Sequence, residues 1–510
     1  MDEFLANINV LSWVTFTPLI GMAVVLCLPR TAGELVKRLT LLFTGIPLVL
    51  ATMMWCVFER GTSAMQFTED MPWIAAWNVR YTLGIDGLSL ALVWLTCLLL
   101  VIATLSSWKV DKGIKGYFAL LMLLEVGING VFVSIDFFLF YVFWEVMLLP
   151  MYFLIGIWGG ERREYAAIKF FLYTLVGSVL MLVAMVGLYL ASSDPVTGEH
   201  TFNILTWQTQ AAAGQLTGYD LFGMPFQTWV FVFLFIGFAI KVPVFPFHTW
   251  LPDAHVEAPT AISVILAGIL LKLGAYGMFR INFPVAPDAF HQFIPMIALL
   301  GVINIVYGAA VAMAQKDFKR MVAYSSVSHM GYVLLGAAAA TEWGWTGANF
   351  MLIAHGTSSA MCFLIVGVLY DRAHHRRIDG FGGIGMVMPV YFGLTTIGFF
   401  ASLGLPGFSG FVAEAVTLWG AFDAFPTYVA ISVVGIVITA AFYLWTMQRV
   451  FLGPRNEDYA DLPDINGREI ACQAPLAFLC LVLGIFPFLL LDVMQPAIKH
   501  TLDLVVGAGG

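Results

Sequence analysis

The segment FAIKVPVFPFHTWLPDAHVEAP, residues 238 to 259, decides how this chain folds. It begins as an apolar helix, places Lys241 among apolar residues, and then meets Pro243 and Pro246. Because each proline lacks a backbone N–H, we expect the helix to break there and to free two backbone carbonyls one turn earlier. An ionisable side chain beside a helix break is typical of an ion path.

The alternative for Lys241 is that its side chain snorkels to the membrane surface, as most lysines near helix ends do. Lys241 lies about 13 residues from the start of its span near Thr228, or ~20 Å at 1.5 Å per residue. His248 and Trp250 mark the exit on the other side. Since a charge at membrane depth costs ~2.5 kcal/mol or more, we favour a functional lysine.

Composition identifies the class of protein. Of the 510 residues, 60% are hydrophobic and 11% are charged, against roughly 25% charged in soluble domains. The net charge of −8 is spread over loops, so nucleic acid is not an expected partner. The six cysteines form no CxxC pair, and we expect no disulfide framework, structural metal or iron-sulfur cluster. The acidic start, MDEFLANINV, is unlike a secretory signal, so we expect the apolar run that follows it to remain as the first span.

The apolar segments predict an all-α polytopic membrane protein with about fourteen spans in a single domain, residues 1–510. Three N-terminal spans fall within 1–110, five in a first unit at 115–281, five in a second unit at 289–452, and one at 471–493. The predicted spans are 11–29, 39–58, 85–107, 115–134, 136–158, 168–191, 228–250, 258–281, 289–313, 322–341, 347–370, 389–420, 427–452 and 471–493.

The distribution of Lys and Arg is an independent check on this count. Eighteen of the 24 fall in loops on one side of the expected membrane, four fall on the other side, and two fall inside spans. Cationic loops face the cytoplasm, so both termini and the loop 192–227 are expected on the outer, periplasmic side.

A second interrupted helix is predicted in LGLPGFSGF, residues 403 to 411. Pro406 and Gly407 should unwind the twelfth span just before Glu414. Five of the sixteen residues at 172–187 also recur 180 positions later, which suggests an internal repeat. Interrupted helices in corresponding halves are the mark of a transporter core, and units of an odd number of spans must insert with opposite topology.

Ionisable side chains within apolar spans form a candidate proton path. Burial disfavours the charged form of both amines and carboxyls, so each can load and release a proton near neutral pH. We expect an ion pair between Lys241 and a glutamate on a neighbouring helix, and a relay through bound waters beyond it. The path residues are Glu145, Lys241, Lys272, His329, His355 and Glu414, with His248 and Glu125 as possible further relays.

Other interpretations of these residues remain open. A single buried histidine is more often a hydrogen-bonded packing residue than a relay. Asp136 is expected to cap the start of its helix. GFGGIG at 380–385 matches the dinucleotide fingerprint formally, but no strand precedes it, so we expect no cofactor there.

Three long motifs resemble one family. AIKVPVFPFHTWLPDAHVEAPTAISVILAGILLKLGAYGMFR, QKDFKRMVAYSSVSHMGYV and LGLPGFSGFVAEA look like the antiporter-like proton-channel subunits of respiratory complex I and their relatives in cation/proton antiporters. The resemblance covers roughly residues 80 to 455. It implies two inverted five-helix repeats, broken seventh and twelfth helices, and a polar axis with key positions at Glu145, Lys241, Lys272 and Glu414. Glu at the last position is similar to the M-type group, equivalent to mitochondrial subunit 4.

The same resemblance implies partners and a location. The chain would sit in a bacterial inner membrane beside two sibling antiporter-like chains, within a proton-translocating NADH:quinone oxidoreductase. Flavin, iron-sulfur clusters and quinone would lie on partner subunits, with no cofactor or metal on this chain. The alternatives are a subunit of a multisubunit cation/proton antiporter, a subunit of a membrane-bound hydrogenase, or a membrane enzyme with its own redox cofactor.

The topology gives a first testable prediction. Single cysteines introduced between residues 195 and 220 should react with an impermeant thiol reagent added outside intact cells, because that loop carries no Lys or Arg. Cysteines introduced at His374 or Asn456 should not react. Labelling in the opposite pattern would overturn both the orientation and the span count.

Overall fold

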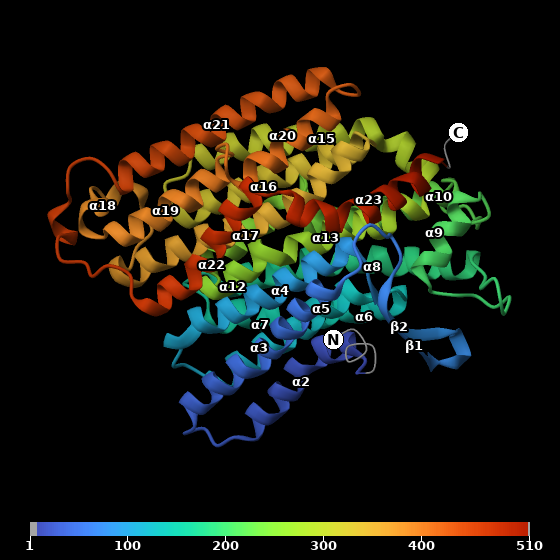
Figure 1. Cartoon of the computed structure of the whole chain (residues 1–510), viewed down its shortest axis with the longest axis horizontal. Helices are drawn as coiled ribbons and strands as arrows, with labels where there is room; N and C mark the ends of the chain where they lie inside the picture. The colour runs from blue at the N-terminus through green and yellow to red at the C-terminus, as the bar shows by residue number, and fades with distance from the viewer. Residues whose placement is uncertain (1–7, 508–510) are drawn as a thin grey trace.

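The computed structural model describes residues 8–507 and shows a bundle of closely packed helices whose axes are roughly parallel (Figure 1). Loops around α18 (Ile384–Val387) lie at one end of the bundle, and the short helix α9 (Ile204–Ala212) lies at the other. The first half contains α2 (Val10–Cys27), α3 (Gly33–Val57), α4 (Gly87–Ser106), α5 (Ile114–Val133), α6 (Phe137–Val146), α7 (Leu148–Trp158), α8 (Arg163–Ala191) and α10 (Phe226–Lys241).

The second half continues from the first broken helix. Its elements are α11 (Trp250–Glu257), α12 (Thr260–Ile265), α13 (Leu271–Gly277), α14 (Phe283–Val285), α15 (Pro287–Met313), α16 (Phe318–Ala338), α17 (Glu342–Ala373), α19 (Pro389–Ser402), α20 (Ser409–Ala421), α21 (Pro426–Val450), α22 (Gly467–Ile485) and α23 (Phe488–Gly507). Two π-helical turns, Leu266–Leu270 and Met278–Asn282, join α12, α13 and α14 into one continuous helix.

The predicted fold class is confirmed. Between residues 8 and 507, eleven helices are long and apolar enough to cross a membrane. Two shorter apolar helices, α10 and α19, are the first halves of the two broken helices. Adding α16, whose 21 residues include several Ser and a His, gives a helix for each of the fourteen predicted spans.

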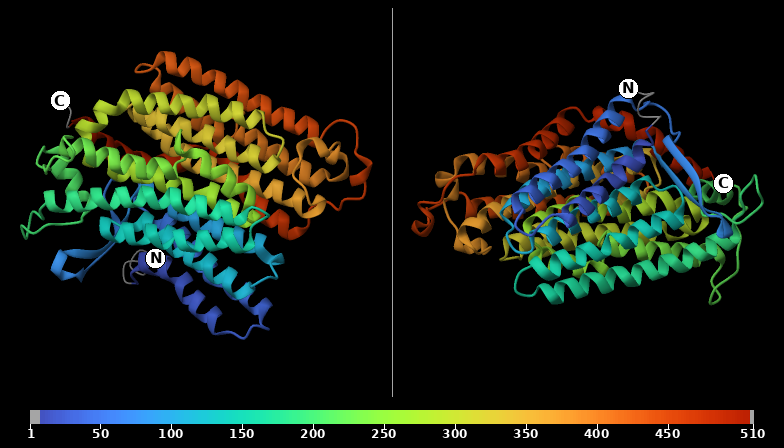
Figure 2. Two further views of the ribbon diagram at one scale, coloured as in Figure 1. Left: turned by 180° about the vertical axis from the view of Figure 1, so that it is seen from behind. Right: turned by 90° about the horizontal axis from the view of Figure 1, so that it is seen from below.

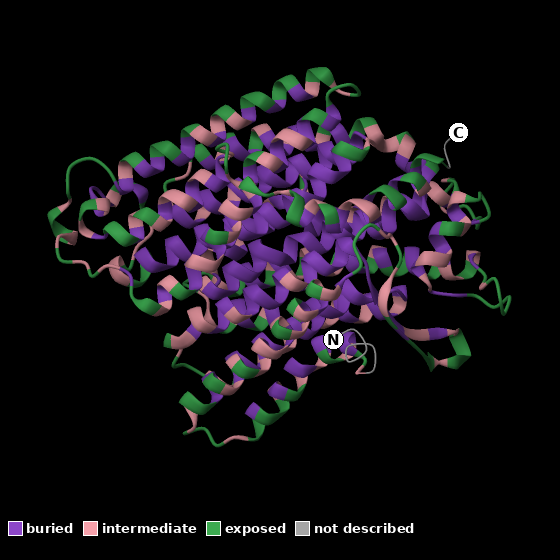
Figure 3. Ribbon diagram, in the orientation of Figure 1, coloured by how far each residue is buried: buried purple, intermediate pink, exposed green. Residues whose placement is uncertain are grey.

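The centre of the bundle is built from the helix formed by α12 to α14 and from α17. The most apolar stretch of each of these two helices is completely buried by protein. The corresponding stretches of α3, α8, α21 and α22 are less than half buried. Figure 3 shows the same gradient, with buried residues in the middle and exposed ones along α21, α2 and α3. The other views confirm that these outer helices lie at the edges of the bundle (Figure 2). A polar group within the buried stretch of α13 or α17 is therefore shielded from lipid on every side.

The first break lies where the prolines predict it, but not both of the carbonyls expected to be free are unpaired. The carbonyl of Ala239 accepts a hydrogen bond from the Val244 N–H at 2.9 Å, so the prediction of an unpaired carbonyl there is wrong. Trp250 Nε1 donates to the carbonyl of Ile240 at 2.8 Å. These bonds give two carbonyls at the end of α10 hydrogen-bond partners. A buried carbonyl without a partner would destabilise the break.

Asn304 on α15 fastens the segment between the two prolines. Its Oδ1 accepts the Phe245 N–H at 2.8 Å, and its Nδ2 donates to the carbonyl of Pro243 at 3.2 Å. One buried amide thus replaces two backbone partners that a continuous helix would have supplied.

The second break separates α19 from α20, as predicted from Pro406 and Gly407. Gly404 and Gly407 have φ angles of +75° and +95°, in the left-handed region that glycine adopts without strain. A Cβ at Gly404 would also strike the carboxylate of Glu414. This turn therefore requires glycine for both its conformation and its contact.

A β-hairpin was not predicted. Strands β1 (Gln66–Ile74) and β2 (Val79–Ile85) pair antiparallel beside the start of α2 (Figure 1). The side chain of Arg80 donates to Asp70 at 2.9 and 2.6 Å, and this contact holds the pKa of Asp70 below its usual range. The Ile135 N–H donates to the carbonyl of Thr82 at 2.9 Å, which attaches the hairpin to the bundle.

The predicted last span, 471–493, is wrong at its end. α22 stops at Ile485, and α23 begins after Pro487, a residue that cannot continue the preceding helix. Apolar residues spaced three and four apart in α23 are buried against α4 and α17, while charged residues interrupt the sequence. Because these charges interrupt the apolar run, the length of apolar sequence did not predict this amphipathic helix.

Asn304 provides a test of how the first break is stabilised. Asn304→Leu should lower the temperature at which the detergent-purified protein aggregates, because two buried backbone groups lose partners at about 1–3 kcal/mol each. Ser432→Ala is the matched control, since Ser432 Oγ bonds only the carbonyl of Tyr428 in its own helix. Equal aggregation temperatures for the Asn304→Leu variant and the wild type would contradict this account.

Candidate functional site

Four of the predicted path residues form one connected line through the centre of the bundle. Lys272 Nζ donates to His355 Nδ1 at 2.7 Å. The ring of His355 lies 5.3 Å from the ring of His329, centre to centre. His329 Nε2 is 3.8 Å from Glu414 Oε1. All four side chains are buried, with at most 5% of any residue exposed.

A local irregularity of the helix positions Lys272. The π-helical turn Leu266–Leu270 directly precedes α13, and Lys272 Nζ also donates to the carbonyl of Ala267 within that turn. A π turn carries an extra residue, and such turns are frequent at functional sites. The amine is therefore held between a backbone acceptor on its own helix and the imidazole of His355 on α17.

The other end of the line is built on the second break. His329 Nε2 donates to the carbonyl of Ser402, the last residue of α19, at 2.9 Å. Glu414 lies on α20 and its carboxylate packs against Gly404 in the unwound segment. Side chains from α16, α17 and α20 therefore meet beside the unwound segment that joins α19 to α20.

Lys241 lies at the first break, but its environment differs from the prediction. Its ammonium nitrogen is 5.3 Å from the ring centre of Trp144 and 5.4 Å from that of Phe170. Over the described part of the chain, no carboxylate lies within 4.0 Å of this nitrogen, so the expected ion pair with Glu145 is not formed. Aromatic faces stabilise the cation here in place of a carboxylate.

Glu145 is the next residue after Trp144 and lies near the end of α6. It is only partly buried, and one of its carboxylate oxygens is enclosed. Helix α7 begins two residues after Val146, and Pro150 is its third residue. Glu145 is thus less buried than the other path residues, and it directly follows Trp144, one of the two aromatic residues that form a cage around Lys241.

The two parts of the predicted path meet where α10 contacts α13. A Cβ at Gly274 would lie 2.6 Å from the carbonyl of Phe238 and 3.0 Å from Cβ of Lys241. Lys272 is two residues before Gly274. The end of α10 and the helix that carries Lys272 are therefore in backbone contact.

The two possible further relays lie away from this line. His248 is enclosed by the rings of Phe245, Tyr307 and Tyr324, at 5.8, 5.3 and 6.3 Å. Glu125 is fully buried on α5, and neither of its oxygens bonds to any residue from 8 to 507. Their assignment as relays stays a prediction.

Asp136 has the structural role expected of it. Its side chain accepts the Leu139 N–H at 3.0 Å as the N-cap of α6, and also accepts the Arg80 N–H at 3.1 Å. The carboxylate thus joins the start of α6 to strand β2, and we assign it no part in the path.

The burial of two further ionisable side chains, His255 and Lys319, was not predicted from the sequence. His255 is fully buried and stacks face to face on Phe363, with ring centres 4.2 Å apart. Lys319 was assigned to a loop, yet it is 4% exposed and donates to the carbonyl of Ala258. The sequence did offer a signal for His255, because it follows the same break as His248 and lies seven residues later.

The arrangement is suited to moving protons between nitrogen and oxygen atoms that lie in hydrogen-bond contact or one water apart. In the chain from residue 8 to residue 507, no three His, Cys, Asp or Glu side chains gather in a geometry that would hold a metal ion. The line itself contains an amine, two imidazoles and a carboxyl, each of which binds and releases a proton.

Comparisons with known proteins agree with this geometry. Residues 134–439 match the family described as NADH:quinone oxidoreductase/Mrp antiporter, TM. The chain is 41% identical over 500 residues to NADH-quinone oxidoreductase subunit M of Rhodobacter capsulatus, covering 96% of each. It is 39% identical over 457 residues to F(420)H(2) dehydrogenase subunit M of Methanosarcina mazei, covering 89% of this chain and 90% of the other.

A solved structure gives the same result in three dimensions. A chain of respiratory complex I from Thermus thermophilus with bound NADH superimposes with a TM-score of 0.86 at 30% identity, covering 97% of this chain and 99% of that one. The chain therefore belongs to the family of NADH:quinone oxidoreductase and Mrp antiporter transmembrane subunits, in the group of antiporter-like membrane subunits of respiratory complex I.

Proposed function

We propose that this chain translocates protons across the membrane as the M-type subunit of a NADH:quinone oxidoreductase. The observation that carries the proposal is the connected line from Lys272 through His355 and His329 to Glu414. Its relatives of 41% and 37% identity that cover nearly the whole chain are named as subunit M of that enzyme.

The line supplies most of what a proton relay needs. Lys272 and His355 are in direct hydrogen-bond contact, so a proton crosses that link without an intervening molecule. The 3.8 Å gap between His329 and Glu414 closes with a small movement or one water. Because these groups are buried in an apolar core, a charge held on one of them is costly, which favours passing it on.

Lys241 and Glu145 form the proposed gate. The aromatic cage stabilises the ammonium by roughly 0.5–2 kcal/mol, less than a close carboxylate would in a site without water. Movement of the Glu145 carboxylate toward the cage would stabilise the charge on Lys241, and its withdrawal would favour release of the proton. The contact between α10 and Gly274 passes this change to the helix that carries Lys272.

The driving reaction belongs to other subunits in this proposal. Flavin, iron-sulfur clusters and quinone would lie on partner chains, and two sibling antiporter-like chains would share the same membrane arm. The chain would lie in a bacterial inner membrane with its Lys- and Arg-rich loops in the cytoplasm and both termini in the periplasm. The charge distribution over the loops supports this orientation.

A cation/proton antiporter subunit is the second candidate, because the matching family includes Mrp antiporters. Tagging the chain and identifying the proteins that copurify separates the two. A flavoprotein and iron-sulfur subunits select the oxidoreductase, whereas other antiporter subunits without redox proteins select the antiporter.

The gate predicts the behaviour of Lys241 variants. Lys241→Ala should keep assembly but lower redox-driven proton uptake in reconstituted vesicles more than tenfold, because no other amine lies in the cage of Trp144 and Phe170 in the described chain. Lys241→Arg should fail too, since guanidinium does not deprotonate in this pH range. Glu145→Gln should also lower uptake steeply.

Lys499→Ala, at an exposed position on α23, is the matched control and should pump normally. Normal pumping by an assembled Lys241→Ala variant would instead show that Lys241 is a structural residue.

The end of the line predicts a separate result for Glu414. Glu414→Gln should abolish proton uptake because an amide does not release a proton, while the amount of intact complex on native gels stays unchanged. Glu414→Asp shortens the side chain by ~1.5 Å, a gap that one water bridges, so partial uptake is expected. If Glu414 only stabilises the second break, Glu414→Gln would reduce assembly and leave turnover per complex intact.

A further inference from the structure

A cavity of about 240 Å³ opens at the Lys- and Arg-rich end of the bundle, and the line described above does not include it. Its walls come from the end of α4, the start of α5, α12, α17 and α22. We infer that this cavity is an aqueous inlet through which protons enter from that face, with Gln473 as the residue that holds its water. The inference rests on the proposed function and adds the place where protons enter.

Gln473 is the observation that points to water. It lines the cavity from α22, none of its surface is exposed, and neither its Oε1 nor its Nε2 has a partner in the part of the protein that the structure describes. A buried amide left unbonded is destabilising, so most such groups bond to protein or to water. A space of this size accommodates on the order of eight waters at ~30 Å³ each.

Other polar side chains line the cavity besides Gln473. The hydroxyl groups of Ser107 and Tyr117 are hydrogen-bonded to each other at 2.8 Å, and both residues line the cavity. Ser106 and Thr260 add two more hydroxyls. Hydroxyls both donate and accept, so a chain of waters has partners on several sides.

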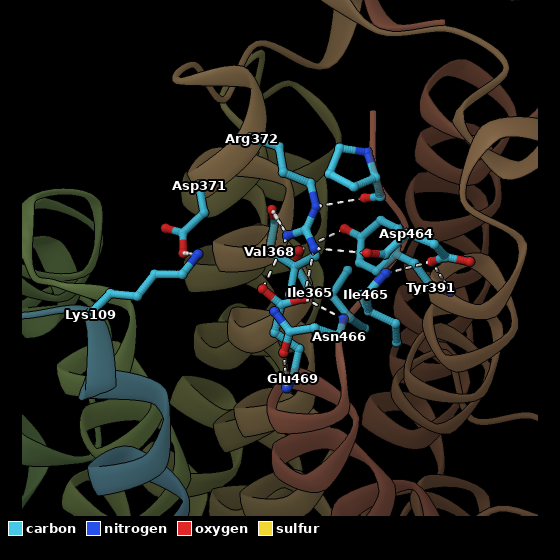
Figure 4. A network of polar contacts seen from close by, with 11 residues as sticks. Lys109, Ile365, Val368, Asp371, Arg372, Tyr391, Asp464, Ile465, Asn466 and Glu469 are labelled. Carbon is cyan, nitrogen blue, oxygen red and sulfur yellow. Dashed lines mark hydrogen bonds and ion pairs between the residues drawn. The ribbon is translucent and has the colours of Figure 1, made fainter. Parts of the chain in front are cut away.

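Charged residues surround the mouth. Figure 4 shows Lys109 on one side reaching toward Asp371 on α17, with a separation of 3.5 Å. This pair is largely exposed, with 61% and 44% of the two side chains accessible, so it is screened by solvent and is weak. A contact of this kind does not close the entrance.

A second ion pair fixes the opposite wall. Arg372 donates to Glu469 at 2.7 and 3.2 Å and to the carbonyls of Pro463 and Asp464 (Figure 4). Both side chains are more than 90% buried. This network holds the start of α22 against the end of α17, and so keeps Gln473 in position.

The balance of charge around the cavity favours water over an anion. Lys109 and Arg468 line it together with Asp371 and Glu469, two cations and two anions. These four charges sum to zero, so they offer a phosphate or an anionic lipid headgroup no net attraction. Neutral water bonds to groups of either sign.

The inner end of the cavity lies near the buried line. Leu364 lines the cavity and directly follows Phe363, on which the ring of His255 stacks at 4.2 Å. His355 lies nine residues earlier on the same helix, about 13.5 Å away at 1.5 Å per residue. In this inference, a chain of about five hydrogen-bonded waters spans the remaining distance from the cavity to Lys272 and His355.

Two native cysteines on α22 provide the test of access. Cys472 lines the cavity beside Gln473. Cys480 lies eight residues later on the same helix, is fully buried against Thr357 and does not line the cavity. The other four cysteines would first be replaced by serine, in two versions of the intact complex that keep either Cys472 or Cys480.

The probe is the small, impermeant thiol reagent 2-(trimethylammonium)ethyl methanethiosulfonate, added to inside-out vesicles that expose the Lys- and Arg-rich face. Cys472 should react at least tenfold faster than Cys480, and its modification should slow redox-driven proton uptake. Equal and negligible reaction of both cysteines would overturn the inlet.

A second measurement uses Gln473 itself. Gln473→Leu keeps the size of the side chain but removes both hydrogen-bonding atoms, so proton uptake should slow several-fold at unchanged assembly. Gln473→Glu restores a polar group at the same position and should recover most of the rate. Full uptake by an assembled Gln473→Leu variant would remove Gln473 from the path.

The outcomes separate this inference from the proposed function. If Lys241→Ala and Glu414→Gln lose uptake in the same vesicles while Gln473→Leu does not, the inlet is wrong and proton translocation along the line stands. If Lys241→Ala and Glu414→Gln both pump normally, the proposed function itself fails.

Discussion

The hydrogen bond between Lys272 and His355 is the contact on which the rest of the site depends. It joins α17 to the continuous helix formed by α12, α13 and α14. The most apolar stretches of these two helices are completely buried. An amine in such surroundings is tolerated only where acceptors are provided for it. The π turn supplies one acceptor and the imidazole supplies the other, so the geometry of both helices is coupled to the state of a single nitrogen.

The broken helices serve this arrangement by opening the backbone while side chains replace several of its lost hydrogen bonds. Trp250 and Asn304 bond the exposed groups of the first break, and His329 bonds the carbonyl of Ser402 at the second. Irregular backbone inside a membrane persists only where protein groups replace the missing hydrogen bonds. One of these replacements, His329, is itself part of the line, which links the conformation of the second break to the protonation of the relay.

Much of this architecture follows from the sequence, because proline positions, apolar length and isolated ionisable residues act locally. Most of the spans, both breaks and the members of the line from Lys272 to Glu414 were predictable for that reason. The cage around Lys241 was not, since Trp144 and Phe170 belong to other helices and their approach depends on packing. Burial of Arg280 in an ion pair with Asp86 was equally hidden, because the partners are 194 residues apart.

The aromatic cage of Lys241 has an electrostatic consequence. A ring stabilises a cation through its quadrupole and leaves the net charge in place, whereas a carboxylate would cancel it. Like charges repel more strongly in a medium of low dielectric constant than in water. A protonated Lys241 therefore keeps an uncancelled positive charge beside the backbone contact between α10 and the helix that carries Lys272.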